Sequence, residues 1–224
     1  MAQAETDRPS LIICRTIIGY GSPNKAGTGS AHGEPLGEEE VRLSKERLEW
    51  SYEEPFTVPA EVLVHLRQAQ ERGNRQQQEW EARLDAYRET HPGEVQRLMV
   101  DLSGDLPEGW DSDLTTLFTG QDKPVSTRGA SGQVMNAIAE KVHSLAGGAA
   151  DLAPSTRTIL NDSGHFGLED YSGHNLHFGI REHAMGAIAN GISLHGGMIP
   201  YTATFLIFYD YMRPPVRLAA LMGI

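Results

Sequence analysis

The sequence contains little of what would mark a secreted or membrane protein. A single cysteine, Cys14, among 224 residues excludes an intrachain disulfide bond and suits a reducing compartment. No apolar run approaches the ~20 residues that a membrane helix needs. The N-terminus M-A-Q-A-E-T-D-R-P-S is acidic and polar, unlike a signal peptide. These absences predict a cytoplasmic protein without a membrane partner.

Basic residues are also scarce. The 30 acidic and 19 basic residues give a net charge of −11, which argues against nucleic acid as the main partner. No H-E-x-x-H helix and no cysteine pair accompanies the five histidines between positions 165 and 195, so a zinc site is not predicted. Those histidines are His165, His174, His177, His183 and His195.

What is present is an alternation of helix and strand patterns from about residue 123 onward. Such alternation is typical of a parallel sheet flanked by helices, so the predicted fold class is α/β. Upstream, the stretch 59–91 has sparse apolar positions and predicts a long, largely solvated helix. The second half is expected to contain helices over 126–143, 181–194 and 205–222, and strands near 145–150 and 197–202.

Both ends of the chain predict an incomplete fold. The run Leu11–Gly19 has the pattern of a buried strand, and few residues precede it to supply neighbouring strands. The last residues, R-L-A-A-L-M-G-I, stop within an apolar helical pattern. We therefore expect a part of a larger α/β enzyme, incomplete at both ends.

Glu182 stands at the start of a predicted helix that is rich in small residues. Three aromatic residues come later in the sequence, after this helix and the strand that follows it. A buried carboxyl group facing aromatic rings suits a flat heteroaromatic cofactor whose ring nitrogen shares a proton. Two other interpretations stay open, a glutamate that complements the helix dipole and an ion pair with Arg181. The aromatic residues Phe205, Phe208 and Tyr211 share a helix face, and such stripes more often belong to a core.

Four further residues carry weaker signals. His32 lies in a glycine-flanked polar loop, where it contacts phosphate or is merely solvated. Arg128 precedes a helix start, where a guanidinium and free N–H groups can bind phosphate, although an ordinary surface arginine fits equally. Asp151 and Ser155 flank a turn after an apparent strand, the edge where α/β sheets place ligand groups.

Taken together, these segments resemble the transketolase family, whose members are thiamine-diphosphate-dependent ketol transferases. The loop T-I-I-G-Y-G-S-P-N-K-A-G-T-G-S-A-H-G-E-P-L-G is similar to the end of the family's diphosphate-binding domain. The blocks S-T-R-G-A-S, G-G-A-A-D-L-A-P-S, H-F-G-I-R-E-H-A-M-G-A-I-A-N-G-I-S-L-H-G-G and P-Y-T-A-T-F-L-I-F-Y-D-Y resemble its pyrimidine-binding domain. The resemblance covers nearly the whole chain and keeps the family's order.

The resemblance implies roles for particular residues. Glu182 matches the catalytic glutamate that hydrogen-bonds the aminopyrimidine of the cofactor, and His32 matches a catalytic histidine that reaches both the diphosphate and the substrate. Arg128 and Ser155 match ligands of the sugar phosphate. The remaining matches contribute to cofactor binding, and they are Phe205, Phe208 and Tyr211 around the pyrimidine, with Asp151 and Leu152 lining the cleft.

The resemblance also implies three segments, cofactors and partners. Residues 1–57 match the tail of the diphosphate-binding domain, 58–106 a helical connector, and 107–224 the first part of the pyrimidine-binding domain. Thiamine diphosphate, Mg²⁺, sugar phosphates and a second copy of the chain in a homodimer are implied. The family's G-D-G metal motif has no match among the 224 residues, so no metal ligand is predicted and the polypeptide alone is expected to be inactive.

Two alternatives to transketolase are kept. The first is another ketol transferase with the same cofactor, of the dihydroxyacetone synthase or deoxyxylulose-phosphate synthase type. The second is a non-catalytic remnant that binds an intact subunit.

Overall fold

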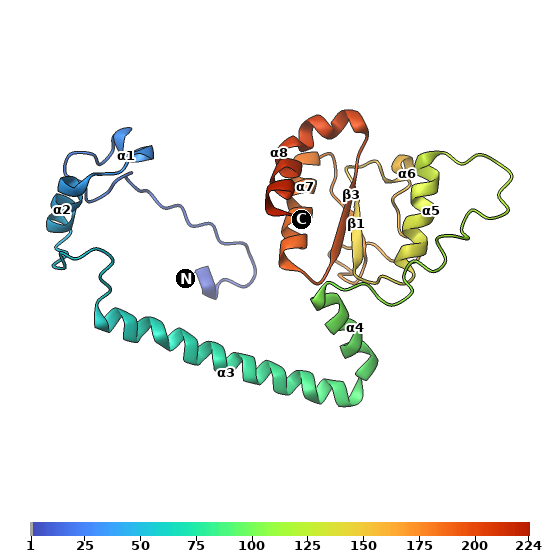
Figure 1. Cartoon of the computed structure of the whole chain (residues 1–224), viewed down its shortest axis with the longest axis horizontal. Helices are drawn as coiled ribbons and strands as arrows, with labels where there is room; N and C mark the ends of the chain where they lie inside the picture. The colour runs from blue at the N-terminus through green and yellow to red at the C-terminus, as the bar shows by residue number, and fades with distance from the viewer. Residues whose placement is uncertain (1) are drawn as a thin grey trace. The chain divides into compact units, whose positions relative to one another are not determined.

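The computed structural model describes residues 2–224, and the chain divides into two compact units between Gln77 and Gln78. Figure 1 labels the main helices and strands of the two units. The elements, in order, are η1 (Ala2–Ala4), α1 (Ser30–Gly33), α2 (Glu38–Arg47), α3 (Ala60–Thr90), α4 (Pro92–Ser103), α5 (Thr127–Ala139), β1 (Leu145–Ala149), α6 (Ala153–Thr156), β2 (Asn175–His177), α7 (Glu182–His195), β3 (Ile199–Ala203), η2 (Leu206–Phe208) and α8 (Tyr209–Met222).

A three-stranded parallel sheet forms the centre of the second unit. The strand order is β2-β1-β3, with β1 hydrogen-bonded to both neighbours. Leu145 pairs with Ile199 at the start of β1 and Ala149 pairs with Ala203 at its end. The parallel sheet expected from the alternating pattern is therefore confirmed. The short strand β2 was not predicted, because three residues are too few to show a period.

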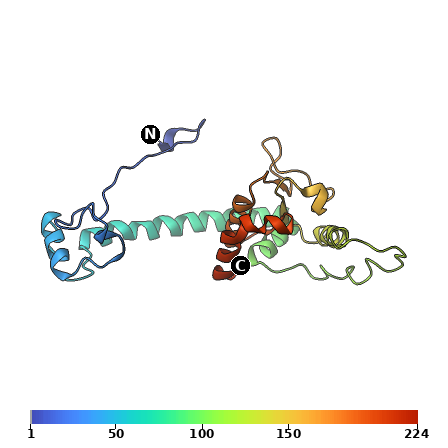
Figure 2. The same cartoon turned by 90° about the horizontal axis from the view of Figure 1, so that it is seen from above.

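Helices cover both faces of this sheet. Helices α7 and α8 lie on one face and α5 lies on the other (Figures 1 and 2). The buried apolar cluster of Ala150, Phe178, Met185 and Met212 packs beneath α7 and α8, and Met185 is fully buried. This core fixes the start of α7 against the end of β1, where the candidate site lies.

Gly186 allows α7 and α8 to approach each other closely. A Cβ atom at Gly186 would lie 2.9 Å from Pro215 Cγ and 3.2 Å from Met212 Cε. Asn190 of α7 also donates its side-chain N–H to the carbonyl oxygen of Pro215 at 2.9 Å. The two helices that carry the site's side chains are therefore tightly fixed to each other.

The first unit contains α1, α2 and the beginning of α3, and the expected strand over Leu11–Gly19 is wrong. That segment is irregular, and the side chains of Leu11, Ile12 and Ile13 are 85%, 71% and 86% exposed. A buried parallel strand needs hydrogen-bonded neighbours on its edges, and no strand among the described residues pairs with this segment. The apolar pattern is present without the sheet that would bury it.

The helix predicted over 59–91 and the predicted helices of the second half are found, with one correction. Helix α3 has no buried residue, as expected for a solvated helix, and α4 follows directly at Pro92. The helix expected over 205–222 begins instead as the 3-10 turn η2, with Phe205 just before it in extended backbone. Over residues 2–224, no helix is long and apolar enough to cross a membrane.

Candidate functional site

The candidate site lies where the three parallel strands end. The chain leaves β1 into Ala150–Leu152, leaves β2 into Phe178–Arg181, and leaves β3 into Thr204 and Phe205. Because parallel strands end at one edge of the sheet, these three segments meet there. Ligands of open α/β sheets bind at this edge.

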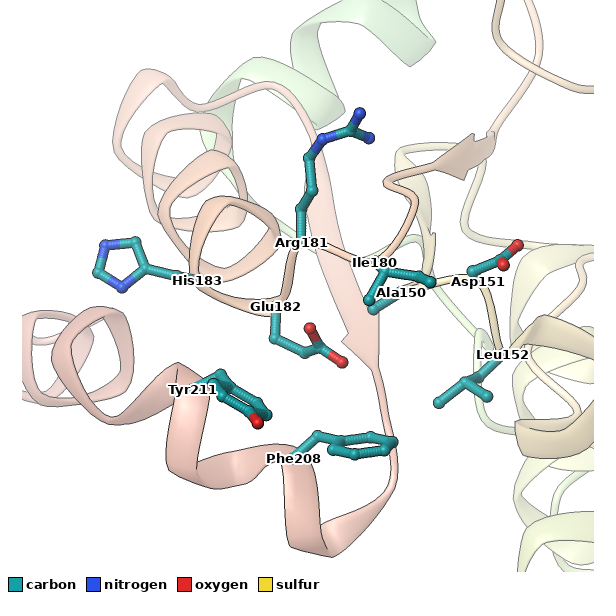
Figure 3. A pocket seen from close by; sticks show the side chains of 9 residues that line it. All are labelled: Ala150, Asp151, Leu152, Ile180, Arg181, Glu182, His183, Phe208 and Tyr211. Carbon is teal, nitrogen blue, oxygen red and sulfur yellow. The ribbon is translucent and has the colours of Figure 1, made fainter.

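A cavity of about 570 Å³ opens at this edge, and Glu182 lies at its centre. Glu182 is the first residue of α7 and is only 7% exposed. Its carboxylate points into the cavity, whereas the neighbouring side chains of Arg181 and His183 point away from it (Figure 3). Arg181 instead donates to the carbonyl oxygen of Phe178 at 3.0 Å. The alternative interpretation, an ion pair between Glu182 and Arg181, is therefore not found.

Thr204 holds the carboxylate of Glu182 from the opposite side. Its hydroxyl group donates to Glu182 Oε1 at 3.3 Å, and it is the one hydrogen-bond partner of this carboxylate among residues 2–224. Thr204 follows β3 directly, so the sheet register places it opposite the start of α7. Sequence analysis did not identify this residue, because a threonine after a strand carries no signal of its partner 22 positions away.

Two of the three predicted aromatic residues line the cavity with Glu182. Phe208 and Tyr211 lie below the carboxylate in Figure 3, and their ring centroids are 6.2 Å apart. Phe205 packs on Phe208 at 6.2 Å with nearly parallel rings, but it is not among the residues that line this cavity. The three aromatic residues therefore form a row, and only Phe208 and Tyr211 of this row line the cavity with Glu182.

Asp151 and Leu152, which closely follow β1, line the same cavity. Asp151 has a positive φ of 58°, a conformation that aspartate tolerates better than most residues but that is uncommon outside glycine. Its amide donates to the carbonyl oxygen of Ala149 at 2.9 Å, which fixes the sharp turn. Uncommon backbone conformations held by their surroundings are frequent at ligand sites.

Arg128 and Ser155 lie together at a second cavity of about 610 Å³, which Phe205 also lines. Arg128 lies within the first turn of α5 and not before it, and it donates to the carbonyl oxygen of Ser155 at 3.3 Å. The N-cap residue Ser126 accepts a hydrogen bond from the amide of Gly129 at 3.3 Å. Both predicted phosphate ligands are exposed, so an anion can reach them.

His32 lies in the first unit, and its position is described only within that unit. The loop expected around it contains a helical turn, α1, and the His32 side chain is exposed. Its amide donates to the carbonyl oxygen of Gly29 at 3.1 Å. Among residues 2–224, no group of three or more His, Cys, Asp or Glu side chains has the arrangement of a metal site.

Comparison with known proteins defines the class of this chain. A family model described as "Transketolase, thiamine diphosphate binding domain" matches residues 1–107, and one described as "Transketolase, pyrimidine binding domain" matches residues 123–224. Together with the parallel α/β fold and the cavity at its edge, these matches define a protein built from thiamine-diphosphate-binding domains. More particularly, the chain belongs to the transketolase family.

The individual relatives agree with this assignment. The chain is 47% identical to the transketolase of Geobacillus stearothermophilus and 45% identical to that of Bacillus subtilis (strain 168), over all of this chain and 33% of each relative. A transketolase of Pichia stipitis in complex with sedoheptulose 7-phosphate superposes with a TM-score of 0.88 and 38% identity, over 96% of this chain and 32% of that one. The Campylobacter jejuni transketolase has a TM-score of 0.81 and 34% identity, over 97% and 32%. The chain thus spans about a third of the length of the relatives that it matches. These relatives are named as transketolases, which are enzymes.

Proposed function

We propose that this chain supplies the pyrimidine-binding side of a thiamine diphosphate site in a transketolase-type enzyme. The observation that carries the proposal is the buried Glu182 carboxylate, which faces Phe208 and Tyr211 across one cavity. The size and lining suit a heteroaromatic ring, because small-molecule sites are typically concave, mostly apolar and equipped with few polar groups. Glu182 is the polar group that can recognise a ring nitrogen.

The roles of the residues follow from their chemistry. Glu182 holds a proton at its carboxyl oxygen against a pyrimidine nitrogen, and Thr204 limits the rotation of that carboxyl group. Phe208 and Tyr211 orient the ring and exclude water. When bound, thiamine diphosphate supplies the thiazolium carbon through which a two-carbon ketol unit passes from a ketose phosphate to an aldose phosphate.

Arg128, Ser155 and His32 would bind the sugar phosphate. Arginine binds phosphate in a bidentate geometry, and the exposed guanidinium of Arg128 lies at a cavity that it shares with Ser155. The similar Pichia stipitis protein in complex with sedoheptulose 7-phosphate supports the same substrate class. His32 is the third substrate ligand in this proposal.

The remaining assignments concern segments and partners. Residues 1–57 would be the tail of the diphosphate-binding domain, 58–106 the connector and 107–224 the first part of the pyrimidine-binding domain. Mg²⁺ and a second copy of the chain in a homodimer would complete the site. A dihydroxyacetone synthase or deoxyxylulose-phosphate synthase activity, or a non-catalytic remnant that binds an intact subunit, is the alternative.

A chimera tests the proposed function. These 224 residues replace the matching third of the Geobacillus stearothermophilus transketolase, and ketol transfer from xylulose 5-phosphate to ribose 5-phosphate is measured with thiamine diphosphate and Mg²⁺. We expect transketolase turnover. A folded chimera that binds the cofactor and transfers no ketol unit would favour the non-catalytic alternative.

The 224-residue polypeptide made alone should have no measurable turnover under the same conditions. No G-D-G motif occurs among its residues, and an unneutralised diphosphate would be poorly held. Ketol transfer by the purified polypeptide would contradict this expectation.

A further inference from the structure

Glu40 is the centre of a polar cluster in the first unit. It lies in the first turn of α2 and is 8% exposed. Its Oε1 atom accepts hydrogen bonds from the Ser22 hydroxyl group and from the amide of Asn24 at 2.9 Å, and its Oε2 atom accepts from Asn24 Nδ2 at 2.9 Å. The Ser22 Oγ atom accepts in turn from the amide of Lys25 at 3.1 Å. One carboxylate therefore fixes the segment 22–25.

This segment belongs to a tightly folded loop that contacts the turn of His32. The amide of Gly27 donates to the carbonyl oxygen of Ile18 at 2.8 Å, which closes the loop. Gly19 has a φ of 66°, and a Cβ atom there would lie 2.9 Å from Ala31 Cβ. Ala31 precedes His32 in α1, so the loop held by Glu40 lies directly against the turn that carries the histidine.

Lys25 fixes the other end of the same loop. Its ammonium group donates to the carbonyl oxygen of Leu36 at 2.9 Å and to that of Pro35 at 3.4 Å. Thr28 donates to the carbonyl oxygen of Lys25 at 2.7 Å, and its hydroxyl group is 2.7 Å from that of Ser30. The segment 25–36 is thus closed by side chains at both ends, with His32 inside it.

We propose that Glu40 is a positioning residue for His32, acting through the loop 19–28. The simpler interpretation, a glutamate that only complements the dipole of α2, already fits the exposed Glu39, which pairs with Arg42 at 2.7 Å. Glu40 differs because both of its oxygen atoms accept hydrogen bonds from the loop. The functional importance of holding His32 in place rests on the proposed function, in which this histidine contacts the cofactor and the substrate.

Hydrogen exchange on the 224-residue chain tests the proposal without any cofactor. In Glu40→Gln, the amides of residues 22, 24–27, 31 and 32 should exchange at least ~10-fold faster than in the unsubstituted chain, because their hydrogen bonds depend on the loop. Glu39→Gln, which makes the same charge change one residue away, should leave them unaltered. Faster exchange confined to the first turn of α2, or no protection of these amides in the unsubstituted chain, would overturn the proposal.

A second variant covers the case in which Glu40→Gln unfolds the whole first unit. Asn24→Ala removes one of the three donors to Glu40, the side-chain Nδ2, from an exposed position and leaves α2 unaltered. It does not remove the Asn24 amide itself, so its effect depends on the lost side-chain bond and the loosened loop. We expect faster exchange in the same amides, by a smaller factor. Unaltered exchange in Asn24→Ala after global unfolding of Glu40→Gln would reduce Glu40 to a stabilising residue.

The NMR chemical shift of the His32 ring is a second measurement, and a change in loop stability alone would not alter it. The carbon–proton NMR signal of the ring, assigned by its loss in His32→Gln, should shift in Glu40→Gln and stay in place in Glu39→Gln. An unshifted signal in Glu40→Gln would overturn the positioning role. Neither measurement involves turnover, so failure here leaves the proposed function intact, and an inactive chimera leaves the positioning role intact.

Discussion

The two units each bury one glutamate near the start of a helix, and the two carboxylates have different surroundings. Glu40 in α2 is 8% exposed and Glu182 in α7 is 7% exposed. Glu40 accepts three hydrogen bonds from its own loop, whereas Glu182 accepts one, from Thr204. Burial alone therefore does not distinguish a structural carboxylate from one that is available to a ligand. The two carboxylates differ in the number of hydrogen bonds that they accept.

The surroundings of the two side chains explain the difference. Glu182 lies beside the apolar cluster that contains Phe178 and Met185, so apolar packing holds its helix and leaves the carboxylate free of a structural task. The first unit buries Ser22 and Glu40 themselves, and it has no comparable apolar cluster among the described residues. In the first unit, the hydrogen bonds of Glu40 therefore hold the loop in place of apolar packing.

The comparison predicts its largest effect for Glu182→Gln in the chimera. Glutamine keeps the size and one hydrogen bond but cannot hold the shared proton, so turnover should fall by ~10²–10⁴-fold while the cofactor is still bound. Steady-state rates and a cofactor titration measure the two quantities. Glu169→Gln, at an exposed position, is the matched control. Near-normal turnover of Glu182→Gln at saturating cofactor would make Glu182 an ordinary helix-start residue.

Met185→Ala should have the largest effect on stability. Met185 is fully buried in the apolar core beneath α7, and truncating such a side chain typically costs about 2–5 kcal/mol. Chemical denaturation of the chain, followed by hydrogen exchange in α7, measures the loss. Met198→Ala, at a 39% exposed position, should cost less than about 1 kcal/mol. Equal losses in the two variants would mean that the core does not hold α7.

The sequence predicted much of the second unit because its signals are local. Glu182 begins α7 as expected, since small and apolar residues at helical spacing mark that helix. Asp151 and Leu152 fall at the carboxyl end of β1 because a strand and a turn follow each other in the sequence. The parallel sheet follows from the alternation of helix and strand.

Other features depend on contacts between residues that are distant in the sequence, and these contacts leave no local sequence pattern. The hydrogen bond from Thr204 to Glu182 depends on the sheet register, and that from Ser22 to Glu40 depends on how a glycine-rich loop folds back. The strand expected over Leu11–Gly19 was wrong for a related reason, because an apolar pattern cannot show whether partner strands are present. The roles of the aromatic row and of His32 rest on the family resemblance and stay predictions.

Thr204→Val in the chimera should have a smaller effect than Glu182→Gln. Valine keeps the shape and removes the one donor to the carboxylate, and a net hydrogen bond contributes about 1 kcal/mol, or roughly fivefold in kcat. Thr204→Ser keeps the hydroxyl group and should restore most of the rate. A loss in Thr204→Ser as large as in Thr204→Val would indicate that packing matters here and the hydrogen bond does not.

The smallest predicted effect is a lowered pKa of the Glu40 carboxyl group. This shift is the most direct sign of a carboxylate with a structural role. Hydrogen bonds from Ser22 and then Asn24 lower the pKa of Glu40 from 4.5 to about 2. Because the pKa in the folded chain is depressed, the contribution of Glu40 to stability is full above pH 4.5 and is lost as the pH falls through about 2.

A carbon NMR titration of the Glu40 carboxyl group measures this midpoint, and Asn24→Ala should raise it by removing the side-chain donor of Asn24 from the anion. The neighbouring Glu39 supplies an internal reference, since Arg42 also lowers its pKa while its side chain stays exposed. Asn24→Ala should leave the midpoint of Glu39 in place, because Asn24 donates to Glu40 and not to Glu39. A midpoint of Glu40 at or above 4.5 in the unsubstituted chain would mean that the loop does not hold the carboxylate in solution. The contrast between the two buried glutamates would then rest on Glu182 alone.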